Sequence, residues 1–242
     1  MRYKINFAYN GKSFSGWQIQ PNGKSIQGEL EYVLSILLRA DIQVVGAGRT
    51  DAGVHSKKMT AHFDFAEKIA DLTQLKQRLN SFLPRSIAIL EIFEANDNFH
   101  ARFDAVKRTY EYHLTQTKNP FLTDFAYYFP KKLDFEKMNA AAKILFDYQN
   151  FTSFSKLHTD VKTNNCVIFQ ANWKKQNEVW IFTISANRFL RNMVRAIVGT
   201  LLLTGENKIS LDDFRKIIEA ENRNKAGISV PAHGLFLVDV EY

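Results

Sequence analysis

Short runs of alternating hydrophobic and polar residues are separated by longer runs in which apolar residues recur every three or four positions. Alternation predicts half-buried strands, and the longer spacing predicts amphipathic helices. Up to residue 93 the order is strand 3–9, helix 26–39, strands 42–45 and 59–65, helix 72–82 and strand 87–93. This β-α-β-β-α-β order is typical of the split βαβ unit in ferredoxin-like folds. Ser25 is expected to cap the first helix, and Pro84 to end the second.

The polar segment 94–106 has no sustained period, and we place a domain boundary there, which gives domains 1–105 and 106–242. The second domain shows a similar order of elements: strands 109–115 and 126–129, helix 135–146 capped by Asp134, strands 167–173 and 179–186, helices 189–204 and 211–221, and strand 235–240. Polar loops are expected at 21–23 and 174–178. The predicted fold class is therefore α+β, with two ferredoxin-like, RRM-like halves.

Charge and composition narrow the class of protein. The 242 residues carry a formal net charge of +7, which favours a polyanionic partner such as nucleic acid. The single cysteine, Cys166, excludes an intramolecular disulfide and suits a reducing compartment. The longest apolar stretch, near residues 196–203, is far shorter than the roughly 20 residues that span a bilayer. A cytoplasmic protein without a membrane segment is expected.

Residues 46–55, with the sequence GAGRTDAGVH, form a predicted loop between two apolar strands, and they contain the candidate chemistry. The three glycines indicate unusual backbone angles or close approach of another group. Asp51 and Arg49 lie between them. Asp51 is either a reactive carboxylate or a simple turn residue, and the spacing alone does not choose between these roles.

Basic residues provide further candidates. Arg195 lies in the most apolar predicted helix, where it either has a partner or extends to the surface. Arg188 and Arg191 are predicted to form a basic strip along the same helix, and an ordinary solvated face is the alternative. Three dibasic pairs are candidates for RNA contact: Lys57–Lys58, Lys107–Arg108 and Lys131–Lys132. As bare pairs, all three are more simply explained as solvated.

Metal and nucleoside-triphosphate sites are not indicated. The six histidines show no metal-ligand spacing with Cys166 or with paired carboxylates, and His55 is expected to shape the loop. Gly11-Lys12-Ser13 and Gly23-Lys24-Ser25 imitate the end of a P-loop, but each lacks the glycine five residues earlier.

The loop and four other blocks resemble, in family order, the motifs of the tRNA pseudouridine synthase A family. The blocks are residues 9–18, 46–55, 99–103 with 108–110, 186–195 and 231–235. They extend over nearly the whole chain. One departure is Asn10, where the family usually has Asp, and this concerns a local turn or an RNA contact.

The resemblance implies isomerisation of uridine to pseudouridine at positions 38 to 40 in the anticodon stem-loop of tRNA. It implies Asp51 as the catalytic residue, no cofactor and no metal. Arg195 would be the basic partner of Asp51, the ring of Tyr110 would lie against the target base, and Arg49 would help to displace that base. It further implies a homodimer and a joined antiparallel sheet with the site in a cleft between the halves. Attack on C1′, attack on the uracil ring and formation of a glycal all remain open as routes.

Two other classes of protein share some of these features. A non-catalytic RNA-binding module with two RRM-like halves explains the charge and the element order, but the aromatic RNP1 pattern is missing from the sequence. A sugar- or phosphate-acting hydrolase would need a second carboxylate or a Walker motif, and the glycine-rich loop supplies neither. Tyr110 is also open to a simple reading as a core aromatic of its strand.

Overall fold

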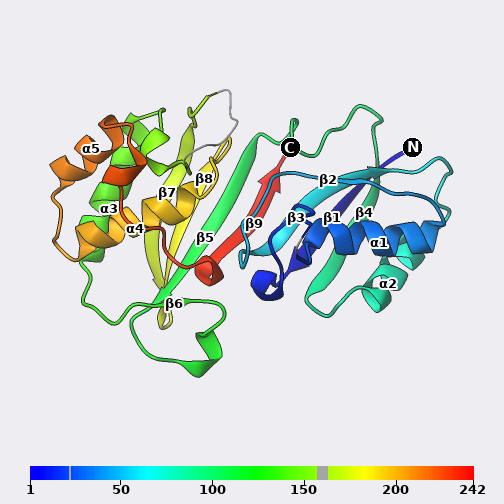
Figure 1. The fold of residues 1–242 in the computed structure, drawn as a ribbon, viewed down its shortest axis with the longest axis horizontal. Helices are drawn as coiled ribbons and strands as arrows, with labels where there is room; N and C mark the ends of the chain where they lie inside the picture. The colour runs from blue at the N-terminus through cyan, green and yellow to red at the C-terminus, as the bar shows by residue number, and fades with distance from the viewer. Residues whose placement is uncertain (22, 157–162) are drawn as a thin grey trace. The chain divides into compact units, whose positions relative to one another are not determined.

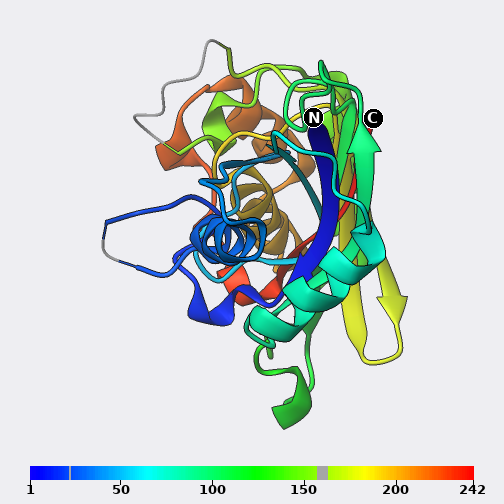
Figure 2. The ribbon, with the colours of Figure 1, turned by 90° about the vertical axis from the view of Figure 1, so that its right-hand side faces the viewer.

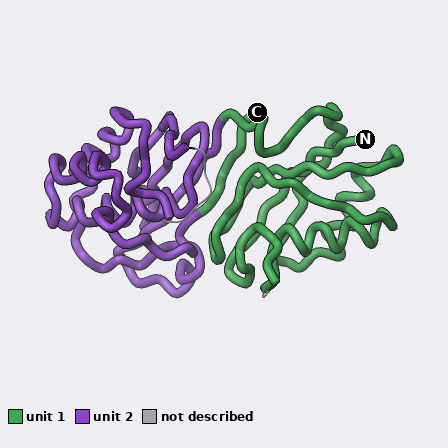
Figure 3. Tube along the Cα trace, turned by 45° about the horizontal axis from the view of Figure 1, so that its top comes forward, with its two compact units in different colours: residues 1–106, 236–242 green, residues 107–235 purple. Residues whose placement is uncertain are grey.

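A computed structural model of the protein describes residues 1–21, 23–156 and 163–242, and it divides into two compact units (Figure 3). Unit 1 comprises residues 1–106 and 236–242, and unit 2 comprises residues 107–235. The last strand, which we expected in the second domain, thus belongs almost entirely to unit 1. Asn22, in the turn expected at 21–23, lies outside the described residues.

Unit 1 contains helices α1 (Ile26–Leu38) and α2 (Leu72–Phe82), which lie on one face of its sheet (Figures 1 and 2). Its strands are β1 (Arg2–Tyr9), β2 (Val44–Gly46), β3 (His55–Asp64), β4 (Ile87–Ala95) and β9 (Leu235–Glu241). Strand β1 pairs with β3 and β4, and β2 pairs with β3, all antiparallel. Strand β9 is parallel to β3 and pairs with its first residues.

The hydrophobic pattern explains both kinds of element in unit 1. Alternate residues of β1, including Tyr3, Ile5 and Phe7, are fully buried. On α1 the residues with three- and four-residue spacing face the same core. Ser25 caps α1 as expected, because its hydroxyl oxygen accepts a hydrogen bond from the Gly28 N–H at 3.1 Å.

Unit 2 is built on strand β8 (Val179–Ala186), which pairs antiparallel with both β5 and β7. The other elements are β5 (Lys107–Thr115), β6 (Tyr127–Tyr128), α3 (Phe135–Ile144), β7 (Ile168–Gln176), α4 (Met193–Gly205) and α5 (Leu211–Glu219). Helix α4 is buried along almost its whole length and forms the centre of the core. The fold class of the chain is α+β.

The largest differences from the predicted element boundaries are found in α4, β7 and β3. Helix α4 begins at Met193, four residues later than expected, because Asn192 has a left-handed backbone (φ 66°) that a helix cannot continue through. Strand β7 extends to Gln176, so the expected five-residue loop is a two-residue turn in which Asn177 has φ 54°. Strand β3 begins at His55, inside the segment that we predicted to be a loop.

None of the described helices has both the length and the apolar character that crossing a membrane requires.

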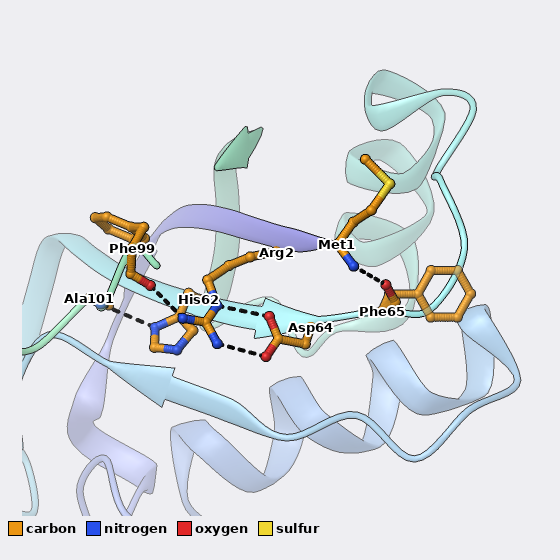
Figure 4. Close-up of polar contacts among 7 residues, drawn as sticks. All are labelled: Met1, Arg2, His62, Asp64, Phe65, Phe99 and Ala101. Atoms are coloured by element: carbon orange, nitrogen blue, oxygen red, sulfur yellow. Dashed lines mark hydrogen bonds and ion pairs between the residues drawn. The ribbon is translucent and has the colours of Figure 1, made fainter. Parts of the chain in front are cut away.

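Polar contacts around Arg2 hold the N-terminal end of β1 in unit 1 (Figure 4). The guanidinium of Arg2 donates two hydrogen bonds, both of 2.8 Å, to the carboxylate of Asp64 and a third to the carbonyl of Phe99. Nearby on β3, the imidazole of His62 is buried, and its Nδ1 accepts the N–H of Ala101 at 3.1 Å. That hydrogen bond requires an unprotonated Nδ1.

We expect His62 to make the protein sensitive to acid. Burial, with smaller effects from the charges of Arg2 and His100, lowers the pKa of His62 from 6.5 to about 4. The unfolded chain therefore binds a proton that the folded chain rejects, and stability falls as the pH drops from 6.5 to 4. The full effect is about 3 kcal/mol.

Urea unfolding of the wild type and of His62→Asn at pH 7 and pH 4.5 measures this effect. Asparagine keeps an acceptor near the Nδ1 position but does not titrate, so the variant should lose less stability than the wild type between these two pH values. The lowered pKa of Asp64, caused by its hydrogen bonds with Arg2, costs stability mainly below pH 3.8, and both proteins keep this ion pair. An equal loss in both proteins would show that His62 is not the cause.

Candidate active site

The loop of residues 46–55 joins β2 to β3 in unit 1 and is anchored on both sides of Asp51. The Ala47 N–H donates to the carbonyl of Thr60 at 2.8 Å. The hydroxyl of Thr50 is 2.8 Å from the Tyr9 hydroxyl, in the interior. After Asp51 the chain turns through Gly53, whose φ of 79° favours glycine, and the Val54 N–H donates to the Asp51 carbonyl. Asp51 itself is half-buried.

The segment 10–18, which follows β1, closes over this loop. Gly16 (φ 102°) packs so closely that a Cβ there would lie 2.6 Å from the Thr50 carbonyl oxygen. The next N–H, that of Trp17, donates to the same oxygen at 3.1 Å. The indole of Trp17 lies against Gly46, where a Cβ would be 2.6 Å from the ring. The glycines in the two segments thus allow two backbones to meet around Asp51.

His55 links these two segments. It is 1% exposed, its Nδ1 accepts the N–H of Gly11 at 3.1 Å, and its ring stacks on Phe236 of β9 with centroids 4.7 Å apart. A Cβ on Gly11 would collide with the Val54 carbonyl. His55 therefore helps to shape the loop. Within residues 1–21, 23–156 and 163–242, no group of three or more potential ligands is placed to hold a metal ion.

Asn10 has a local role in this arrangement. Its side-chain oxygen accepts the N–H of Lys12 at 3.0 Å and caps a single 3₁₀ turn, Gly11–Ser13. Asparagine and aspartate both cap turns through a side-chain oxygen, so the departure from the usual Asp preserves this contact.

Arg195 lies in the first turn of α4 in unit 2 and is half-buried. Its Nε donates to the carbonyl of Val230 at 2.7 Å, and the Val230 N–H donates back to the Arg195 carbonyl at 3.2 Å. This reciprocal pair fixes the guanidinium against the segment 226–231, which we call the strap.

Tyr110 lies on β5 and is half-buried, with its ring edge-on to Phe189 at 5.1 Å. Two residues further along the same strand, Tyr112 is fully buried, and its hydroxyl donates to the carbonyl of Pro231 in the strap. Burial raises the pKa of Tyr112 far above its usual range. Tyr112, and not Tyr110, is thus the fully buried core aromatic of this strand.

The predicted basic strip on one helix is wrong. Arg188 and Arg191 both precede α4, in the irregular chain that ends at Asn192, so they do not share a helical face with Arg195. Arg108 has a structural contact that the sequence did not predict, because its Nη1 donates to the Asn187 carbonyl at 2.8 Å. Lys107 is the first residue of β5 and is half-buried.

Sequence reasoning also missed the strap. The Gly227 N–H donates to the Thr200 hydroxyl of α4 at 2.9 Å, and a Cβ on Gly199 would collide with the carbonyl of Ile228. Arg223 donates to Gly227 and Ser229 of the strap. These contacts join residues far apart in the sequence, and only the glycines at 199 and 227 hint at close backbone packing.

The structure thus places the candidate residues in two sets. Asp51 and Arg49 share one loop of unit 1, whereas Tyr110, Arg195, Arg188, Arg191, Lys107 and Arg108 belong to unit 2.

Comparison with known proteins gives the same family as the sequence motifs. A family profile described as tRNA pseudouridine synthase matches residues 5–104 and 141–242, which include Asp51 and Arg195 but not Tyr110. A protein of Parabacteroides distasonis named tRNA pseudouridine synthase A is 58% identical over 241 residues, which cover 100% of this chain and 96% of that protein. Proteins of the same name from Bacteroides fragilis and Bacillus subtilis are 55% and 39% identical, over 100% of this chain and 96% and 99% of theirs.

The chain belongs to the tRNA pseudouridine synthase family. It is an isomerase that converts uridine to pseudouridine in tRNA. A purely RNA-binding module is not favoured, because these full-length relatives are synthases.

Proposed function

We propose that the enzyme acts on uridines 38 to 40 in the anticodon stem-loop of tRNA, with Asp51 as the catalytic carboxylate. The observation that carries this proposal is the loop of residues 46–55, which two distant segments hold around one half-buried carboxylate. The reaction breaks the N1–C1′ bond of uridine and forms a C5–C1′ bond, while C5 loses its proton and N1 gains one. Nothing is oxidised or hydrolysed, so its balance requires no cofactor.

Each of the other site residues has a proposed part in that reaction. Arg195, fixed by its Nε contact with Val230, places a cation that keeps the carboxylate of Asp51 ionised. The ring of Tyr110, held edge-on by Phe189, stacks on the extruded uracil. Arg49 helps to displace the base from the RNA stack. Lys107, Arg188 and Arg191 contact phosphates of the tRNA. Arg108 does the same through the guanidinium nitrogens other than the Nη1 that donates to Asn187.

The proposed architecture is a pair of ferredoxin-like halves whose sheets join, with the site in the cleft between them. The element order β1-α1-β2-β3-α2-β4 in unit 1, with β1 between β3 and β4, supports a ferredoxin-like arrangement for unit 1. We further propose a cytoplasmic location, where tRNA is available.

Position-resolved mapping tests the proposed specificity. The purified enzyme is incubated with a tRNA transcript that has uridine at 38, 39 and 40 and with a control transcript that has cytidine there. Carbodiimide labelling followed by primer extension detects pseudouridine, whose mass equals that of uridine. We expect primer-extension stops that assign pseudouridine only to positions 38 to 40 of the first transcript. Stops that assign pseudouridine to other positions would refute the proposed specificity.

A homodimer is proposed as the active form, because one chain of 27.9 kDa is small beside a whole tRNA. Light scattering at micromolar protein, with and without tRNA, should give twice the mass of one chain for the protein component. A single 27.9 kDa species in both conditions would contradict it.

A further inference from the structure

A pocket opens in unit 2 beside the strap, on the side where α4 begins. Its volume is about 630 Å³, and it is widely open to solvent. Its lining includes two cationic side chains, three polar side chains and one exposed apolar residue: Lys156, Arg223, Asn192, Asn224, Ser229 and Ile228. Among the described residues that line it, none carries a carboxylate.

Arg223 gives the pocket a fixed positive charge. Its Nη1 donates to the Gly227 carbonyl at 3.0 Å, and its Nη2 donates to the Ser229 hydroxyl at 2.8 Å. A longer contact, of 3.4 Å, reaches the carbonyl of Ala226. All these acceptors are neutral, and burial lowers the pKa of Arg223. A partly desolvated guanidinium held by neutral oxygens gains from an anion that approaches its open side.

The pocket also adjoins the residues that fix Arg195. The Asn192 amide donates to the Ser229 hydroxyl, the same oxygen that Arg223 contacts. The next residue of the strap, Val230, accepts the Nε hydrogen bond of Arg195. A ligand bound in the pocket would therefore lie at a fixed distance from the guanidinium of Arg195.

We propose that this pocket binds a backbone phosphate of the tRNA, with Arg223 and Lys156 supplying the charge and Asn224 and Ser229 supplying polar contacts. The inference rests on tRNA being the substrate, and it adds a contact that orients the RNA relative to Arg195. The apolar side chain of Ile228, 91% exposed at the rim, offers a surface for the adjoining ribose.

Salt titration of tRNA affinity tests this site. Binding is measured from 50 to 300 mM KCl with a transcript that has cytidine at 38 to 40, so that neither turnover nor positional specificity affects the result. Lys156→Gln should weaken binding about fivefold at the lowest salt and reduce the magnitude of the log–log salt slope by about 0.9, the value for one phosphate. Arg223→Gln should do the same, provided that its Tm shows a folded protein.

Lys174→Gln is the matched control, since it removes one positive charge from an exposed position on β7 outside the pocket lining. Its slope should equal that of the wild type. A parallel measurement of Tm with millimolar inorganic phosphate tests whether the pocket binds free phosphate and not the RNA backbone. If the salt slope of Lys156→Gln is unchanged, and if phosphate raises the Tm of the wild type but not of this variant, the pocket binds free phosphate and the proposed RNA contact is refuted. An unchanged slope without such a rise would eliminate the site.

Discussion

Asp51→Asn should abolish pseudouridine formation and leave tRNA binding nearly intact. The substitution preserves size and turn-forming ability, but it removes the charge needed by a nucleophile or a base. We expect turnover to fall by at least about 10⁴-fold, the upper range for the loss of one acid–base group. Affinity should change little, because phosphate contacts supply most of the binding free energy.

Release of tritium from C5 of labelled uracil measures turnover, and filter binding measures affinity on the same preparation. The backbone around residue 51 is held by neighbours, such as the Thr50–Tyr9 hydroxyl contact, that the variant does not touch. A fall in binding equal to the fall in turnover would support a turn role for Asp51. Activity well above background in the pure variant would refute the catalytic assignment.

Arg195→Met should lower turnover by about 10²- to 10³-fold, the usual effect of removing one preorganised electrostatic contact. Methionine retains much of the bulk but leaves Asp51 without the proposed cation. It also leaves the Val230 carbonyl without the 2.7 Å hydrogen bond from Nε, at a cost of about 1–3 kcal/mol in stability. The dissociation constant for tRNA should change much less than turnover.

Arg195→Lys is the matched control for charge, because it keeps a cation but not the planar donor group that meets Val230. We expect its turnover to lie between those of the wild type and Arg195→Met. Urea unfolding shows whether both variants are folded and how much stability each loses. Near-normal turnover in folded Arg195→Met would exclude the proposed pairing with Asp51.

Helices and strands could be predicted from the sequence where local hydrophobic periodicity determines them. Helix α1 and its Ser25 cap follow directly from apolar spacing and a capping residue, and β8 was predicted with its observed bounds. The start of α4 was missed because Phe189 and Leu190 continue the apolar period into a non-helical segment. There, Phe189 packs on Tyr110 of β5, a contact with no local signal.

Contacts over long sequence distances were also not predicted. Lys57 is exposed, so its solvated reading is confirmed, whereas Lys58 is half-buried; both lie in β3, whose first residues pair with β9. The ammonium group of Lys57 is 5.5 Å from the centroid of the Phe236 ring, and Lys58 forms an ion pair with Asp239 at 2.8 Å. These partners are about 180 residues away in the chain. The glycine-rich loop could be predicted from its composition, but the segment 10–18 that closes over it could not.

The parallel pairing of β9 with β3 has a consequence for synthesis on the ribosome. Residues 107–235 separate the two parts of unit 1, and at about 5–20 residues per second their translation takes roughly 6 to 26 s. During this interval the nascent chain holds Asp51 but not the Phe236 ring on which His55 stacks. A polypeptide released early would therefore lack one support of its catalytic loop. Maturation of the active site is thereby tied to translation of the β9 codons.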